Sequence, residues 1–232
     1  MKKITVHSEA VYALAIVLLA LAVSMTATSD FGISMIVAPA FILSQKLGFV
    51  TFGQSEYLVQ GVIFILFCCL MKKVKLVYFS SFLTCLVYGV VLDLWRSLVP
   101  LFNANVTSPQ DLGIPLRLAL FLSGELLTAL SIAMFFKVYL YPQVVDFFVK
   151  GVATRFHFKL TRFKIICDAS MLLISVVLTL VFFGRFVGIG WGTLVLASTN
   201  GLVIGFFSRF LDRFFEIKPL FPRFADHFNL EA

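Results

Sequence analysis

The stretch GIGWGTLVLASTNGLVIGFF, residues 188–207, is apolar and about as long as a membrane span, yet it holds five glycines together with Ser198, Thr199 and Asn200. A transmembrane helix needs about 20 predominantly apolar residues. Small residues at four-residue spacing allow two membrane helices to approach closely. No strand pattern precedes the glycines and no Lys-Ser or Lys-Thr pair follows them, so a phosphate-binding loop is excluded. The stretch therefore predicts a membrane helix with a small-residue face.

The composition of the whole chain also indicates a membrane protein. Its 232 residues are 60% hydrophobic, their mean hydropathy is +1.01, and 28 of them are phenylalanines. Only 13% are charged, whereas soluble domains average about 25%. We therefore expect an all-α polytopic membrane protein that forms a single membrane domain over residues 1–232, with no room for a separate soluble domain.

Six stretches are long and apolar enough to span a bilayer: 10–28, 52–71, 74–95, 116–137, 164–183 and 187–208. The first has the charged start of a signal peptide, but its apolar run is long and its cleavage site is poor, so we expect it to be retained. The stretches 30–47 and 138–160 are left over. The former is short and holds Pro39, and the latter carries several charges. We expect each to form a short interfacial or re-entrant helix. Charge counting alone is compatible with eight spans, and the polarity of 138–160 favours six.

The distribution of basic residues predicts the orientation of the chain. The net charge is +7, and basic residues collect on the cytoplasmic side of membrane spans. With the N-terminus inside, all 19 Lys and Arg residues except Lys46, Arg96, Arg117 and Arg185 fall on that side. Both termini are then cytoplasmic, and 209–232 forms an amphipathic tail. The basic, Phe-rich segments suit anionic lipids on that face, so the positive charge does not indicate nucleic-acid binding.

The sequence holds no pattern typical of catalysis. The four cysteines lie in apolar runs without a CxxC motif and are interpreted as small buried hydrophobic residues. There is no set of residues for a catalytic triad, a metal site or a cofactor loop, so we expect no enzyme activity, no metal and no cofactor. An intramembrane enzyme remains an alternative, because such sites can rest on scattered residues.

An internal repeat relates the two halves of the chain. A shift of 112 residues brings Glu56 onto Asp168, and it brings Lys73 onto Arg185 in a short turn. The same shift relates two stripes spaced by four residues: Ser81, Cys85, Gly89 and Asp93 fall on Thr193, Ala197, Gly201 and Gly205. Repeat one covers about 10–95 and repeat two about 116–208. Three spans per half is an odd number, so we expect two inverted three-helix repeats, each with its short helix, as in many secondary transporters.

These motifs resemble a known family. In VGIGWGTLVLASTNGLVIGFF (187–207), the pattern of Gly192, Thr193 and Gly201 resembles the glycine-threonine helix of the YczE/YyaS/YitT-type bacterial integral membrane proteins, whose function is unsettled. The stretch SSFLTCLVYGVVLDLW (80–95) is similar to the corresponding helix of their first half, which ends in an acid, although two serines replace Gly-Thr. The resemblance covers roughly 10–210 and implies a bacterial cytoplasmic membrane protein. The architecture is also similar to that of the substrate-binding subunits of energy-coupling-factor transporters.

Polar groups inside the spans are the candidate site, because burying them in a membrane is costly. Glu125 lies near the middle of its span and is interpreted either as a substrate or proton site or as a structural acid bonded to a neighbouring helix. Glu56 and Asp93 lie toward the outer ends of their spans, at the depth of Arg96, and predict an outer ion-pair cluster; Asp168 is expected to pair with a nearby base. The candidate substrate-binding residues are Glu125, Glu56, Gln60, Asp93, Asn200, Thr193 and Gly201.

Two functions follow from this pattern. The first is a small-molecule membrane transporter, or a substrate-binding membrane subunit, with a site between the repeats that is lined by the stripes at 81–93 and 193–205 and takes a cationic or neutral substrate. The second is a non-transporting accessory or scaffold protein that binds a membrane protein partner or a second copy of itself. An alanine stripe in the first span supports the second function. A lipid-modifying enzyme is a third hypothesis, for which the sequence offers no nucleophile.

Overall fold

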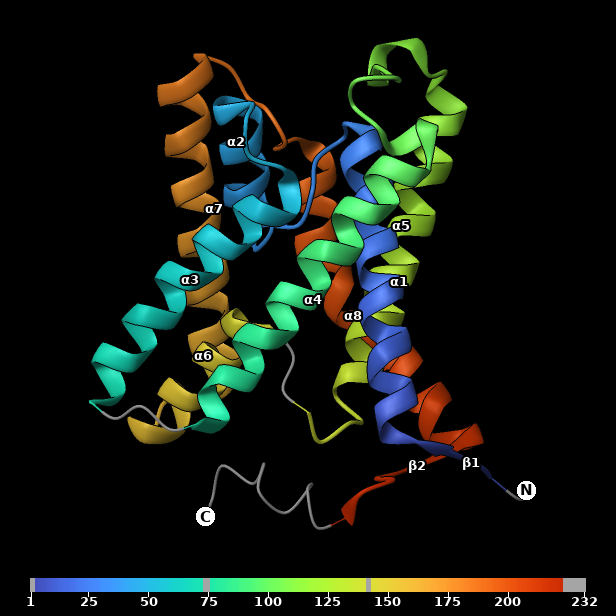
Figure 1. The fold of residues 1–232 in the computed structure, drawn as a ribbon, viewed down its shortest axis with the longest axis vertical. Coiled ribbons are helices and arrows are strands. Elements are labelled where there is room, and N and C mark those ends of the chain that lie inside the picture. The colour runs from blue at the N-terminus through green and yellow to red at the C-terminus, as the bar shows by residue number, and fades with distance from the viewer. Residues whose placement is uncertain (1–2, 73–75, 141–142, 223–232) are drawn as a thin grey trace.

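The computed structural model describes residues 3–72, 76–140 and 143–222, which form a helical bundle with one small pair of strands (Figure 1). The helices are α1 (Ser8–Ser29), α2 (Ala38–Leu47), α3 (Phe52–Met71), α4 (Leu76–Leu98), α5 (Ile114–Phe135), α6 (Val144–Arg155), α7 (Leu160–Phe183) and α8 (Trp191–Phe214), with short 3-10 turns at Pro100–Phe102 and Pro109–Asp111. Among them, α1, α3, α4, α5, α7 and α8 are long and apolar enough to cross a membrane. The predicted all-α, multi-pass architecture is thus confirmed.

A parallel strand pair, which the sequence did not predict, joins the two ends of the described chain. β1 (Ile4–His7) pairs with β2 (Phe215–Lys218), Ile4 facing Phe215. Both lie at one end of the bundle, called the terminal end below (Figure 1). The segment 209–232 therefore begins as the end of α8 and continues as a strand, and its residues 223–232 lie outside the described part. Four-residue strands whose partners are about 200 positions apart leave no local signal in the sequence.

The two halves of the chain run in opposite directions. α1 starts at the terminal end and finishes at the other, called the far end below, where Nε of Arg117 at the start of α5 donates to the carbonyl of Ser29 at 2.7 Å. α5 runs back and finishes at the terminal end, where Lys137 pairs with Asp212 at 2.6 Å. Each half consists of a long, a short and two long helices in chain order.

The short helices α2 and α6 each dock on a long helix of the other half. α2 packs on α7, and Nζ of Lys46 donates to the carbonyl of Phe182 at 3.2 Å. α6 packs on α3, and the Arg155 guanidinium donates to the carbonyl of Met71 at 2.8 Å. A cation is thus placed on the unpaired carbonyls at the C-terminal end of a long helix, where it also interacts favourably with the helix dipole. Helices of 10 and 12 residues are too short to span, as expected for 30–47 and 138–160.

The centre of the bundle is the crossing of α1 and α5, the most buried of the long helices. At this crossing Gly124 lies against the backbone of Ala22 and the side chain of Thr26, so that a Cβ added at Gly124 would come 2.7 Å from Cγ2 of Thr26. α4 then packs on α1, and α8 packs on α5. Close approach at a small residue is the usual way in which membrane helices associate.

The two halves differ in how their last two long helices pack. α3 and α4 pack tightly, and an added Cβ at Gly53 would meet the carbonyl oxygen of Gly89 at 2.1 Å. α7 and α8 make little contact over their described residues. Gly201 and Gly205 on α8 accordingly have no atom within 4 Å of an added Cβ. The small-residue stripe of α4 is therefore used in packing, whereas the lower part of the corresponding stripe on α8 is open.

This difference gives a paired prediction at two glycines related by the 112-residue shift. An alanine at Gly89 would place its Cβ 2.3 Å from Cε1 of Tyr57 and 2.9 Å from the carbonyl of Gly53. Gly89→Ala should therefore lower the stability by about 1–3 kcal/mol, the usual cost of overpacking. Gly201→Ala should leave it unchanged or slightly higher. Thermal unfolding of both variants in detergent checks this, and equal losses would contradict the packing described.

Candidate functional site

A cavity of about 60 Å³ lies between the two halves, large enough for a few water-sized molecules. The first half contributes α1, the segment 34–37 and one side chain of α4 to its wall, and the second half contributes α5, the start of α6 and α8. Most of the wall is apolar, and the polar side chains on it are Thr26, Ser34, Tyr88, Thr128, Gln143, Asp146 and Asn200. This combination of an apolar wall with a few polar groups is typical of small-molecule sites.

Both short helices begin at this cavity. Val37, which precedes α2, and Gln143, which precedes α6, both line it. Each short helix then returns toward the end of the bundle from which the chain entered, α2 to the far end and α6 to the terminal end (Figure 1). Each short helix therefore begins inside the bundle and ends on the side from which the chain entered, which is the path expected of a re-entrant helix. Irregular backbone at membrane depth is tolerated only where it is buried in protein or lines a cavity, and residues 34–37 meet that condition.

Three buried polar atoms on the wall make no hydrogen bond of normal geometry within the described part of the chain: the Tyr88 hydroxyl, Nε2 of Gln143 and Oδ1 of Asn200. The first two lie close enough to interact with each other. The Tyr88 and Gln143 residues are only 1% and 8% exposed. An unsatisfied buried polar group costs about 1–3 kcal/mol, so three around one cavity need a physical reason. A bound molecule that hydrogen-bonds to them would supply it. Tyr88 and Asn200 are themselves related by the 112-residue shift.

The direction of the Gln143 amide follows from a chain of hydrogen bonds. The backbone N–H of Val144 can only donate, and it donates to Oε1 of Gln60 at 3.1 Å. Nε2 of Gln60 therefore faces its two acceptors, Oε2 of Glu56 at 2.9 Å and Oε1 of Gln143 at 3.2 Å. Since its oxygen is used in this way, Gln143 is left with its NH2 group as a donor, and this group lies close to the Tyr88 hydroxyl without a hydrogen bond of normal geometry.

A second cavity continues from the first toward the terminal end. It measures about 220 Å³ and shares Phe135, Phe136 and Asp146 with the first. Asp146 pairs with Lys164 at 3.1 Å, and both line this second cavity. Tyr139, also on its wall, donates to Glu9 at 2.7 Å. Loss of solvation and this bond raise the pKa of Tyr139 to about 12, so the phenol stays protonated at neutral pH.

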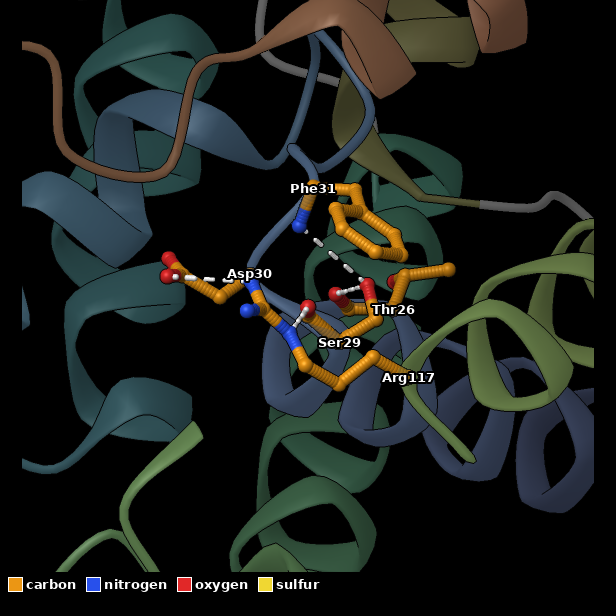
Figure 2. A network of polar contacts seen from close by, with 5 residues as sticks. All are labelled: Thr26, Ser29, Asp30, Phe31 and Arg117. Carbon is orange, nitrogen blue, oxygen red and sulfur yellow. Dashed lines mark hydrogen bonds and ion pairs between the residues drawn. The ribbon is translucent and has the colours of Figure 1, made fainter. Parts of the chain in front are cut away.

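On the far-end side, a layer of aromatic and polar contacts follows Thr26 (Figure 2). The guanidinium of Arg117 lies 4.6 Å from the centre of the Phe31 ring, donates to Ser29 and pairs with Asp30 at 3.4 Å. Phe31 also packs on Trp191, and its carbonyl accepts the N–H of Gly192 at 2.9 Å. This close approach requires glycine in the 188–192 turn, since a Cβ at Gly190 would come 2.4 Å from the Phe31 oxygen.

Of the predicted site residues, only Asn200 lines the cavity. Gln60 and Glu56 lie directly behind it through Gln143. Glu125 is buried beside it, with a carboxylate oxygen that accepts the hydroxyl of Thr199, and it is one helical turn before Thr128 of the cavity wall. The structure thus brings four of the seven predicted residues to one region.

Asp93, Thr193 and Gly201 lie outside this region. Asp93 accepts the Thr51 hydroxyl at 2.5 Å and the Gly53 N–H at 2.8 Å, so it caps the start of α3. Thr193 is buried against Gly32, and Gly201 faces outward from α8. The expected outer ion-pair cluster is wrong: in the described chain Arg96 forms no ion pair with Glu56 or Asp93 and lies over the Phe52 ring instead. Asp168 does pair with Lys164, at 3.9 Å.

Sequence reasoning missed Tyr88 and Gln143. A signal existed for Tyr88, because the predicted repeat of 112 residues aligns it with Asn200. The sequence held no comparable signal for Gln143, because the segment 138–160 was interpreted only from its charged residues. Its importance comes from its place just before a helix whose first turn lies against Gln60.

The buried Tyr88 hydroxyl gives a second paired prediction. Tyr88→Phe removes a buried hydroxyl that makes no hydrogen bond of normal geometry in the described chain, so it should leave the stability unchanged or raise it by up to about 1 kcal/mol. Tyr57→Phe is the matched control, because its hydroxyl donates to the carbonyl of Leu86 at 3.0 Å and its loss should cost about 1 kcal/mol. Thermal unfolding of the ligand-free protein measures both. A loss of stability in Tyr88→Phe would show that the hydroxyl is already bonded.

Comparisons with known proteins leave the chemistry of this site open. No curated protein and no solved structure matches the chain. A family model matches residues 6–209 and thus covers all eight helices except the end of α8. The chain belongs to a family of unknown function, DUF6198.

Proposed function

We propose that the protein is a small-molecule membrane transporter, or the substrate-binding membrane subunit of one, with its site in the central cavity. The observation that carries this proposal is the group of three buried polar atoms without a hydrogen bond of normal geometry in the described chain, those of Tyr88, Gln143 and Asn200, around a cavity between the two halves. A structural core of this kind would be more stable with apolar side chains. Binding sites commonly keep such groups at a cost in stability.

The arrangement of the helices supports transport by two inverted repeats. The short helix of each half packs on the third helix of the other half, as seen in the pairs α2–α7 and α6–α3. The last helix of each half packs on the first helix of its own half, as seen in the pairs α4–α1 and α8–α5. Exchanged contacts of this kind are expected when one half repeats the other with inverted orientation. In transporters with inverted repeats, the substrate lies near the membrane centre between the repeats, beside the ends of discontinuous helices. The starts of α2 and α6 occupy that place here.

The wall of the cavity favours a small neutral solute with a hydrogen-bond acceptor. The NH2 group of Gln143 can donate to an acceptor on a ligand as well as to the nearby Tyr88 hydroxyl, and that hydroxyl can donate or accept. The carboxylate of Asp146 is already paired with Lys164, which disfavours a cation at that end of the cavity. Glu125 does not line the cavity and is engaged by Thr199, so the neutral substrate is favoured over the cationic one that the sequence also allowed.

The terminal end is the cytoplasmic side in this proposal. Most basic residues outside the membrane lie there, and they favour contact with anionic lipids of a bacterial cytoplasmic membrane. The second cavity then lies between the site and the cytoplasm, while the contacts around Phe31 cover the other side. The structure would accordingly correspond to an inward-facing state.

An accessory protein is the second candidate function. It is favoured by the exposure of α7 and α8, the least buried of the long helices, and by the open stripe at Gly201 and Gly205. A partner helix, or a second copy of this chain, would cover such a stripe closely. Purification from native membranes should then yield a stoichiometric complex, whereas a transporter needs none.

Ligand binding tests the transport proposal directly. The purified protein is screened by thermal shift against small neutral, cationic and anionic metabolites, and the stabilising compounds are tested for uptake into proteoliposomes. Neutral compounds with a carbonyl or similar acceptor should bind. Gln143→Leu should weaken binding about tenfold, because it removes one hydrogen bond worth about 1.4 kcal/mol.

Gln45→Leu is the matched control for this experiment. Gln45 is exposed and lines a different cavity at the far end, so its loss should leave affinity unchanged. Equal affinity of wild type and Gln143→Leu would remove the cavity from the mechanism. Binding without uptake, together with a co-purifying partner, would favour the substrate-binding subunit.

A further inference from the structure

Glu56 is the most deeply buried acidic residue of the described chain that has no ion pair. It lies on α3, is 2% exposed, and its Oε1 atom has no hydrogen-bond partner among the described residues. Its Oε2 atom accepts one hydrogen bond, from Nε2 of Gln60 at 2.9 Å. A carboxylate in this position is costly, because neither water nor a cation offsets its charge.

The helices packed on α3 supply no counter-charge to Glu56. α2, α4 and α6 carry the titratable residues Lys46, Tyr78, Cys85, Tyr88, Asp93, Arg96, Asp146, Lys150 and Arg155. The two that face Glu56 are Cys85, whose sulfur lies 3.9 Å from the Glu56 backbone carbonyl oxygen, and Tyr88. Both are neutral in their protonated forms. On α3 itself, the Tyr57 hydroxyl is directed to Leu86.

Three of the basic residues on α2, α4 and α6 interact with groups other than Glu56. Lys46 donates to the carbonyl of Phe182, Arg155 donates to that of Met71, and Arg96 lies over the Phe52 ring. Asp146, the acid on α6, is paired with Lys164. Protonation is therefore the simplest way for the Glu56 side chain to become neutral where it stands.

Glu56 is also connected to the central cavity by a single side chain. Nε2 of Gln60 donates both to Glu56 and to Gln143, and Oε1 of Gln60 accepts the N–H of Val144 at the start of α6. Gln143 is the residue that offers its NH2 group to the cavity. A change in the charge of Glu56 changes the strength of its hydrogen bond with Gln60. Because Gln60 also bonds to Gln143 and to the backbone of Val144, this change can shift Gln143 and the start of α6.

We propose that Glu56 is a proton-binding site that is linked to the central cavity through Gln60 and Gln143, so that transport is coupled to protons; this inference rests on the proposed function. In the step concerned, the carboxylate takes up one proton from water and becomes a carboxylic acid. The proton resides on Oε1, because Oε2 accepts the Gln60 N–H. Linkage is reciprocal: a ligand that draws on Gln143 changes the proton affinity of Glu56, and protonation changes the affinity for the ligand.

Infrared difference spectroscopy of the purified protein in lipid vesicles tests the proton site without any substrate. Spectra recorded between about pH 6 and alkaline buffer, where exposed carboxyl groups stay ionised, should contain the carbonyl band of a protonated carboxylic acid that titrates and shifts in deuterated water. The band should be absent in Glu56→Gln, persist in Glu125→Gln and return in Glu56→Asp. A band that persists in Glu56→Gln, or that is lost only in Glu125→Gln, would overturn the assignment.

Cysteine labelling tests the link to the cavity. Asn200→Cys is introduced into a chain whose cysteines at 68, 69, 85 and 167 are replaced by alanine, and its rate of reaction with N-ethylmaleimide is measured across pH relative to an exposed Ser97→Cys. Because the thiolate is the reactive form, the ratio of the two rates has a pH dependence of its own. The chain with Glu56 should show an additional step in this pH profile, and Glu56→Gln and Gln60→Leu should lack it. A ratio that follows pH equally in all three chains would refute the linkage.

The two proposals can fail separately. Binding and uptake that are independent of pH, with the infrared band absent, would leave the transporter standing and remove the coupled proton. The infrared band and the pH-dependent labelling, without any binding or uptake, would establish a proton-linked cavity in a protein that does not transport. Size-exclusion profiles and circular dichroism of every variant show that each one folds, so a lost band reports on the residue itself.

Discussion

The docking of each short helix on a long helix of the opposite half is the constraint on which the rest of the structure depends. Lys46 of α2 binds the last carbonyls of α7, and Arg155 of α6 binds those of α3. Free C-terminal carbonyls are costly in a membrane unless a donor reaches them. Each half therefore completes the other, and each short helix lies between α3 and α7, one of them from its own half and one from the opposite half.

This docking brings the chain to the membrane centre twice, once before α2 and once before α6. The backbone there is irregular and must be surrounded by protein, which α1, α4, α5 and α8 provide. The first N–H groups of a helix have no partner within the helix, so side chains must supply acceptors for them. At the start of α6, Oε1 of Gln60 accepts the N–H of Val144 at 3.1 Å. A polar residue placed deep in α3 for this structural purpose is also what connects Glu56 with the cavity.

Much of this fold could be predicted from the sequence, because apolar length and charge decide which segments cross a membrane. The six spans, the two short segments and the polar positions Glu56, Gln60, Glu125 and Asn200 come from that signal. The rotation of each helix about its axis does not come from that signal. Asp93 and Thr193 are polar like Asn200, but Asp93 faces the start of α3 and Thr193 faces the loop at Gly32 instead of the cavity. Gln143 and the β1–β2 pair depend on contacts between distant segments, which local patterns do not carry.

The difference between the halves decides which wall of the cavity is held least firmly. On α4, which carries Tyr88, the small-residue stripe is fixed by the close approach of Gly53 and Gly89. On α8, which carries Asn200, a Cβ added at the corresponding Gly201 would have no atom within 4 Å, and α7 makes little contact with α8 over the described residues. In a bilayer, where helices associate mainly by such packing, α8 is held chiefly by α5 and by the contacts around Phe31. Asn200 therefore belongs to the part of the wall that can move at the lowest cost, while Tyr88 and Gln143 stay fixed by their neighbours.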